Sequence, residues 1–183
     1  MLILQLKTQA PVKSTTPIPI AVSACLLGWR VRYDGKDKAH AWVRALFATD
    51  AFVPVPVCPE VLAGLGIPRP PVELVLEEGQ VKALGVSDRR LDVTRSLSCH
   101  AGRWLDRIPA VAGMICKSRS PSCGLRVALH NRRGQDLGLT GEGLFIRVLR
   151  QRLPALPIIE ETALTDRRRR NAFLDQVRAY TRR

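Results

Sequence analysis

The sequence is poor in acidic residues and in aromatic side chains, and it has no long apolar run. Its 183 residues hold 16 Asp and Glu against 29 Lys and Arg, a formal net charge of +13. With only three Trp, two Tyr and four Phe, an aromatic platform for single-stranded RNA is not expected. No segment approaches the roughly 18 apolar residues of a membrane span, and the apolar start Met1–Leu6 is too short for a signal peptide. These absences predict a cytoplasmic protein with no membrane anchor.

The remaining composition is that of an ordinary globular protein. Apolar residues make up 46% of the chain and charged residues 25%, which excludes wholesale disorder. The length is about one domain's worth. We expect residues 1–17 to form a flexible extension and residues 18–183 a single domain with a basic C-terminal helix. The excess of positive charge favours an anionic partner, either nucleic acid or a phosphorylated metabolite.

Short apolar runs alternate with helical patterns along the chain. Strands are expected at 18–22, 52–57, 110–115 and 157–160, and a small hairpin at 72–76 and 80–84. Two prolines indicate that the 52–57 run is either an edge strand or a short strand. Helices are expected at 36–48, from Asp92 onward, at 142–153 with Thr140 as N-cap, and at the C-terminus with Asp166 as N-cap. The pattern predicts an α/β fold: a single open, mostly parallel sheet with helices on both faces, in a Rossmann-like three-layer arrangement with a small hairpin insertion.

Three of the five cysteines share one position relative to the expected strands. Cys25, Cys58 and Cys123 each lie in the loop that follows an apolar run. Loops beyond the carboxyl ends of parallel strands converge on the ligand crevice, so these thiols could meet in space. Thiolates select soft metals and iron–sulfur clusters, whereas a single buried Cys is more often only a small apolar residue. Both interpretations stay open. Structural zinc is disfavoured because it needs four ligands, and the three histidines lie away from these loops.

The residues beside these cysteines are polar or charged. Glu60, just after Cys58 and Pro59, either caps a short helix or serves as a general acid/base. The turn at 120–124 has hydroxyls and amides suited to an anion or a cluster sulfide. Lys117 and Arg119 add positive charge there, unless they are simply solvated. The run Arg167–Arg170 is interpreted as a solvated helix face, with RNA contact as the alternative.

Four motifs, taken in order, resemble one known family. They are Val22–Gly28 (VSACLLG), Arg32–Gly35 (RYDG), Cys58–Glu60 with Pro68–Pro71 (PRPP), and Lys117–Gly124 (KSRSPSCG). This arrangement is similar to the TudS/YbbK-like family of bacterial thiouracil desulfidases. The resemblance covers roughly residues 18–162.

The resemblance implies one α/β domain that binds a [4Fe-4S] cluster through Cys25, Cys58 and Cys123. It also implies an enzyme: a non-redox desulfidase that replaces the thiocarbonyl sulfur of a thiouracil with oxygen and releases sulfide. In that mechanism the substrate sulfur binds the open iron of the cluster. The expected partner is a small thiolated nucleobase or nucleoside. Thiolated tRNA is a further candidate because of the net charge of +13.

The resemblance also assigns residues around the cluster. Glu60 and Ser120 match the acid/base and proton-relay positions, and Lys117 and Ser122 are candidate substrate or anion contacts. Cys99 and Cys116 match no ligand position. Two other interpretations stay open: a non-catalytic iron–sulfur protein for electron transfer or sensing, and a basic RNA-binding module with buried cysteines and no metal.

Overall fold

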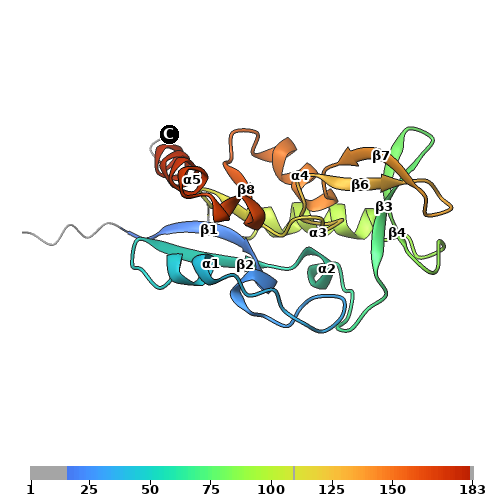
Figure 1. Ribbon diagram of the computed structural model, residues 1–183, viewed down its shortest axis with the longest axis horizontal. Helices are drawn as coiled ribbons and strands as arrows, with labels where there is room; N and C mark the ends of the chain where they lie inside the picture. The colour runs from blue at the N-terminus through green and yellow to red at the C-terminus, as the bar shows by residue number, and fades with distance from the viewer. Residues whose placement is uncertain (1–15, 109, 182–183) are drawn as a thin grey trace, which may run out of the picture.

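Two four-stranded sheets lie at opposite ends of the long axis of the protein (Figure 1). They are seen in a computed structural model that describes residues 16–108 and 110–181. The first sheet has the order β2-β1-β5-β8, and all its pairings are parallel. Its strands are β1 (Ile18–Ser23), β2 (Phe52–Val57), β5 (Met114–Cys116) and β8 (Ile158–Glu160). Strand β2 lies at the edge, as its prolines predict. Most of the predicted extension at 1–17 lies outside the described residues.

Helices cover both faces of this first sheet. Along β1, Ile20 and Val22 point into one core and Ala21 into the other, because side chains alternate along a strand. The core at Ile20 is completed by α1 (Ala41–Leu46) and α5 (Arg167–Tyr180). On the opposite face pack α3 (Thr94–Leu105) and α4 (Leu144–Arg152). The predicted three-layer α/β arrangement is confirmed.

The second sheet was predicted only in part. Its order is β4-β3-β6-β7, and only the β3–β6 pairing is parallel. The strands are β3 (Val72–Glu77), β4 (Gln80–Gly85), β6 (Val127–His130) and β7 (Asp136–Gly141). The predicted hairpin forms as β3 and β4, but it is half of a sheet instead of a small insertion. Leu74 and Leu129 of this sheet pack on Leu97 of α3 and Leu144 of α4, which joins it to the first sheet.

The predicted N-cap at Thr140 is wrong. Thr140 lies in β7 and pairs with Ala128 of β6, and α4 begins four residues later, at Leu144, with Gly143 as its N-cap. The turn that connects β6 to β7 is stabilised by Asn131, whose side-chain oxygen accepts hydrogen bonds from the backbone N–H groups of Arg133 and Gln135. Neither strand of this hairpin is rich in β-branched residues, so the pattern was missed.

Two other elements are shorter than predicted for local reasons. The helix predicted at 36–48 forms only as α1, because Asp37 accepts a hydrogen bond from Ala39 N and His40 caps the helix by accepting one from Val43 N. The strand predicted at 110–115 begins only at Met114. Asp166 is confirmed as the cap of α5, since it accepts hydrogen bonds from the first-turn N–H groups.

Short helices follow the ends of three parallel strands. They are η1 (Ala24–Leu27) after β1, α2 (Pro59–Leu62) after β2, and η2 (Glu161–Thr165) after β8. The run Arg167–Arg170 opens α5 and is largely exposed, with the Arg170 guanidinium 5.6 Å from the centre of the Trp42 ring. Among the described helices, none is both long and apolar enough to cross a bilayer.

The close approach of α5 to the first sheet predicts that Gly113→Ala destabilises the protein. A Cβ at Gly113 would lie 2.7 Å from Val177 Cγ2 and 3.2 Å from the Phe173 ring, so these buried side chains would have to move. We expect a loss of roughly 1–3 kcal/mol in the free energy of unfolding, measured by urea denaturation. The control Gly102→Ala, in α3 with no atom near its Cβ, is expected to gain up to about 1 kcal/mol. Equal stability of Gly113→Ala and the wild type would contradict this packing.

Candidate functional site

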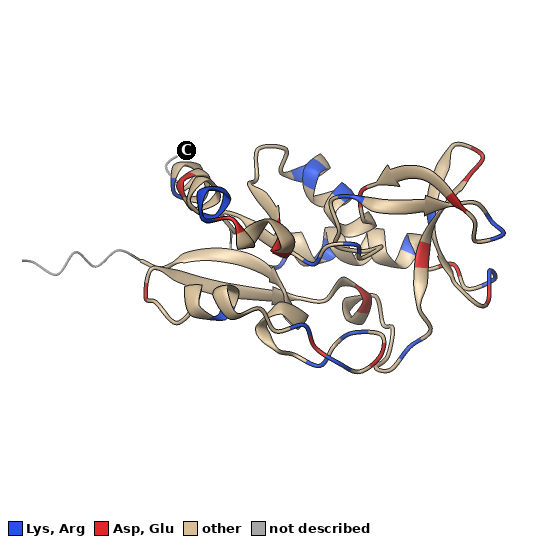
Figure 2. Ribbon diagram, in the orientation of Figure 1, with Lys and Arg blue, Asp and Glu red and all other residues tan. Residues whose placement is uncertain are grey.

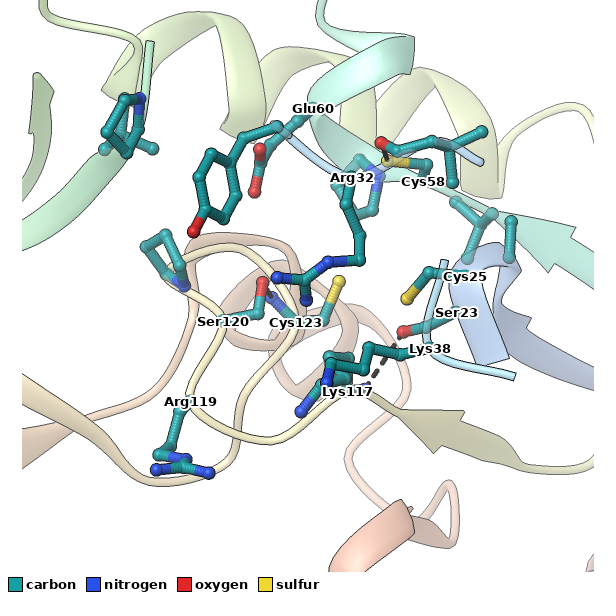
Figure 3. A pocket seen from close by; sticks show the side chains of 18 of the residues that line it. Ser23, Cys25, Arg32, Lys38, Cys58, Glu60, Lys117, Arg119, Ser120 and Cys123 are labelled. Atoms are coloured by element: carbon teal, nitrogen blue, oxygen red, sulfur yellow. Dashed lines mark hydrogen bonds between the residues drawn. The ribbon is translucent and has the colours of Figure 1, made fainter. Parts of the chain in front are cut away.

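A cavity of about 380 Å³ opens where the loops after β1, β2 and β5 meet. Cys25, Cys58 and Cys123 all line it, so the fold brings together the three cysteines chosen from the sequence (Figure 3). Glu60, Lys117 and Ser120 line it as well, whereas Ser122 is fully buried behind its wall.

Local structure places each cysteine. Cys25 lies in η1, directly after β1, and Cys58 is the N-cap residue of α2 with Pro59 at the first helical position. Cys123 closes the turn after β5. There, Ser120 Oγ accepts hydrogen bonds from the N–H groups of Ser122 (3.3 Å) and Cys123 (3.2 Å). The hydroxyl therefore holds the turn in the shape that directs Cys123 into the cavity.

The Cys123 turn lies directly against the start of α4. The Gly143 N–H donates to Gly124 O at 2.8 Å, and the Phe145 N–H donates to Ser122 O at 3.0 Å. A Cβ at Gly143 would lie 2.5 Å from the Ser122 carbonyl, so only glycine permits this approach. The second sheet and α4 thus support the turn from behind.

The three thiols are close enough to influence one another. Burial, and after it the neighbouring Cys58, raise the pKa of Cys25 to about 11, although Arg32 and Lys117 act in the opposite direction. Burial likewise raises the pKa of Cys58, and burial together with Cys58 raises that of Cys123. At neutral pH these thiols are protonated, so a metal centre that takes them as thiolates would release protons on binding.

The donor set suits a cluster better than a single ion. Within residues 16–108 and 110–181, no three His, Cys, Asp or Glu side chains converge closely enough to hold one metal ion. Three thiols spread around a cavity fit an iron–sulfur cluster, in which each cysteine binds a separate iron. None of the histidines lines the cavity. Cys99 is exposed on α3, and Cys116 is fully buried with its thiol against Ile159 O.

Glu60 is fixed by a buried hydrogen-bond network. Arg69 Nε donates to Glu60 Oε2 at 2.7 Å, and Ser122 Oγ donates to Glu60 Oε1 at 2.9 Å. Arg69, only 9% exposed, also donates to the carbonyls of Val31 (3.0 Å) and Gly66 (3.1 Å). Both carboxylate oxygens are therefore oriented by partners that cannot easily rotate away.

The sequence patterns did not predict that Arg69 and Ser122 would contact Glu60. Arg69 lies between prolines in the Pro68–Pro71 motif, and an arginine held in such a rigid segment is the only signal that could have marked it. Ser122 was a candidate substrate contact, and the structure instead directs its hydroxyl to Glu60 from behind the wall.

A second buried ion pair anchors the start of the Cys123 loop. Lys117 Nζ donates to Glu161 Oε1, and the Ser118 N–H donates to Glu161 Oε2 at 2.6 Å. Burial alone would raise the pKa of Glu161, but the hydrogen bonds from Lys117 and Ser118 outweigh it and hold that pKa below its ordinary value. The carboxylate of η2 thus fixes the loop that carries Cys123.

The cavity walls carry an excess of positive charge. Figure 3 labels the cationic side chains of Arg32, Lys38, Lys117 and Arg119 and the carboxylate of Glu60. Arg69 is a further cation in the wall. Such a wall stabilises thiolates and favours anionic ligands.

Comparison with known proteins shows consistent similarities. Residues 20–161 match the model of a family described as 2-thiouracil desulfurase. The uncharacterized protein YbbK of Bacillus subtilis (strain 168) is 31% identical over 153 residues, covering 80% of this chain and 98% of that protein. The solved structure of TudS, described as a [4Fe-4S]-dependent thiouracil desulfidase, superposes with a TM-score of 0.63 at 35% identity, covering 81% of this chain and 93% of that one.

The Lys117–Glu161 pair predicts a stability difference that depends on pH. Glu161→Gln is expected to lose about 1.5–3 kcal/mol of unfolding free energy at pH 7, because it removes a buried charged hydrogen-bond partner. Since the folded pKa of Glu161 is lowered, its contribution is complete above the ordinary value of 4.5 and is lost as the pH falls through the folded pKa. Denaturant titrations from pH 7 to pH 3 should show that the difference in unfolding free energy between the wild type and Glu161→Gln becomes smaller.

The matched control is Glu142→Gln. Glu142 pairs with Arg150 at the surface, where the two side chains are 34% and 43% exposed, so about 0.5 kcal/mol or less is expected. A gap for Glu161→Gln that stays constant down to pH 3 would contradict the role given to its charge.

Proposed function

The chain belongs to the 2-thiouracil desulfurase family, and on that premise we propose that it is a thiouracil desulfidase with a [4Fe-4S] cluster held by Cys25, Cys58 and Cys123. The observation that carries the proposal is that these three thiols and Glu60 line one cavity. The reaction is non-redox: thiocarbonyl and water give carbonyl and hydrogen sulfide. The similarity to TudS, described as [4Fe-4S]-dependent, supports the choice of cofactor.

The cavity suits this cofactor and this chemistry. Three cysteines leave one iron of a four-iron cluster without a protein ligand. When bound, the cluster supplies a Lewis-acidic iron with an open position for the soft sulfur of the substrate. Arg32 and Lys117 lie beside Cys25 and favour its thiolate form, which assists binding.

Glu60 is assigned the proton transfers. Its carboxylate lies in the cavity wall and takes a proton from the water that attacks the thiocarbonyl carbon. Arg69 and Ser122 hold the two carboxylate oxygens, so little reorganisation is needed during the transfer. We assign Arg69 and Ser122 as positioning residues because they act through Glu60.

Ser120 is assigned the proton relay. Its oxygen accepts two backbone hydrogen bonds, from Ser122 N and Cys123 N, which leaves its own hydrogen available to a group in the cavity. The hydroxyl can therefore donate a proton towards the leaving sulfur and recover one from water or from Glu60. Lys117 adds positive charge on the same side.

The cluster assignment predicts about four iron and four acid-labile sulfide per chain in protein purified without oxygen. Three variants, Cys25→Ala, Cys58→Ala and Cys123→Ala, should each lose iron and sulfide, because each removes one ligand of the cluster. Cys99→Ala is the matched control and should keep both, since Cys99 is exposed away from the cavity. Wild-type protein that holds neither iron nor sulfide after anaerobic reconstitution would refute the cluster.

The acid/base assignment predicts that Glu60→Gln keeps the iron content but slows sulfide release from thiouracil by about 10²-fold or more. Ser122→Ala should slow it by about tenfold, the usual effect of one lost hydrogen bond to a charged group. Turnover is measured as sulfide and uracil formed per iron-loaded chain, with Glu142→Gln as the control. Near-normal turnover by iron-loaded Glu60→Gln would remove this role.

A further inference from the structure

A basic loop borders the mouth of the cavity. Residues 28–40, here called the rim loop, connect η1 to α1 without regular secondary structure. Hydrogen bonds hold the loop in place: Lys38 N–H donates to Cys25 O at 3.0 Å, and Arg69 N–H donates to Tyr33 O at 2.9 Å. The rim loop is therefore a fixed part of the surface around the cavity.

Two aromatic side chains of the rim loop are directed to solvent. Trp29 is 52% exposed and Tyr33 is 43% exposed, and they are the aromatic residues among the large exposed apolar side chains of the described chain. Tyr33 lines the cavity, whereas Trp29 lies outside it. The Arg32 guanidinium lies over the Tyr33 ring, 5.4 Å from its centre, and the exposed parts of both rings remain available for stacking.

The rim loop also carries several cations. Lys and Arg alternate with Asp along the rim loop (Figure 2), and Arg119 extends from the facing loop (Figure 3). Asp34 pairs with Arg32, but Lys36, Lys38 and Arg119 have no carboxylate partner among residues 16–108 and 110–181. The rim loop and the facing loop thus combine two exposed rings with positive charge that no described carboxylate neutralises.

The size of the cavity indicates what lies at its mouth. Its volume of about 380 Å³ is near the lower end of the range for ligand pockets. On the proposed function, it must take both a cluster and the thiouracil ring. The sugar and phosphates attached to such a ring would therefore lie outside, next to the rim loop.

We propose that the rim loop binds single-stranded RNA. Trp29 and Tyr33 stack on bases, and Lys36, Lys38 and Arg119 neutralise the phosphates. Proteins that bind single strands combine aromatic rings with a basic surface in this way. Uracil, the base in the family description, indicates RNA over DNA. The scarcity of aromatic residues argued against a stacking platform, but two exposed rings in one basic loop are sufficient for a short strand. Only the claim that the base in the cavity is thiolated rests on the proposed function.

The test is the fluorescence anisotropy of a labelled oligouridylate of roughly eight nucleotides, titrated with the iron-loaded protein at several salt concentrations. We expect saturable binding that weakens as salt rises. Trp29→Ala should raise Kd by about tenfold, because one base loses its stacking partner. Lys36→Ala should lower the slope of log K against log salt by about one.

The matched controls lie on the second sheet, away from the cavity. Leu139→Ala removes an equally exposed apolar side chain (52%) from β7, and Arg133→Ala removes an exposed cation from the turn between β6 and β7. Both should bind as the wild type does. The proposal is overturned if no binding occurs at low salt, or if the control variants weaken binding as much as Trp29→Ala and Lys36→Ala do. That second result would mean that the RNA is attracted by the net positive charge of the protein and not by the rim loop.

The two proposals can fail separately. Oligouridylate binding that depends on Trp29, in a protein that releases no sulfide from thiouracil, would support the RNA surface and refute the proposed activity. Sulfide release from free thiouracil by a protein that binds no oligouridylate would support the proposed activity and refute the RNA surface. Tighter binding of oligothymidylate than of oligouridylate would overturn the choice of RNA.

Discussion

The parallel pairing of β1 with β2 and β5 is the constraint on which the cavity depends. In this register Ser23 lies opposite Val57, and Val22 lies opposite Ile115, so all three strands end at one edge of the sheet. The cysteines that follow these strands are therefore neighbours in space although they are distant in sequence. A slip of one residue would exchange the two faces of β1 and turn the end of the strand away from the cavity. The register fixes both the core and the site.

Buried ion pairs hold the loops around the cavity. The Arg69–Glu60 pair ties α2 to the rim loop, because Arg69 also donates to Val31 O, and the Lys117–Glu161 pair ties the Cys123 loop to η2. Removing a charge pair from water costs about as much as the attraction returns, so such pairs add little net stability. Their contribution is geometry: each charged group has one low-energy position, and an unpaired partner would be costly. The Glu60 carboxylate and the loop that carries Cys123 are thereby held in place by the fold itself.

Sequence patterns predicted the parallel sheet well and the second sheet poorly. β1, β2 and β8 are apolar runs that a pattern can detect, with β1 largely buried and β2 and β8 partly buried at the two edges of the sheet. β7 is almost wholly exposed, with the sequence DLGLTG, so it shows neither a buried run nor β-branched residues. Its pairing with β6 depends on the turn at Asn131 and on contact with β3 through β6. For the same reason, the N-cap of the predicted helix at 142–153 was placed on Thr140, which lies in this strand.

The sequence by itself determined the strand-end positions of the three cysteines, the neighbouring Glu60 and the motifs of the family, because each of these is carried by consecutive residues. Tertiary structure alone decided that Ser122 donates to Glu60, 62 positions away, and that Arg69 completes the pair. It also decided that Trp29 and Tyr33 remain exposed beside unpaired cations. Such relations depend on distances between separate segments, which are set by the packing of the whole chain, and no local pattern records them.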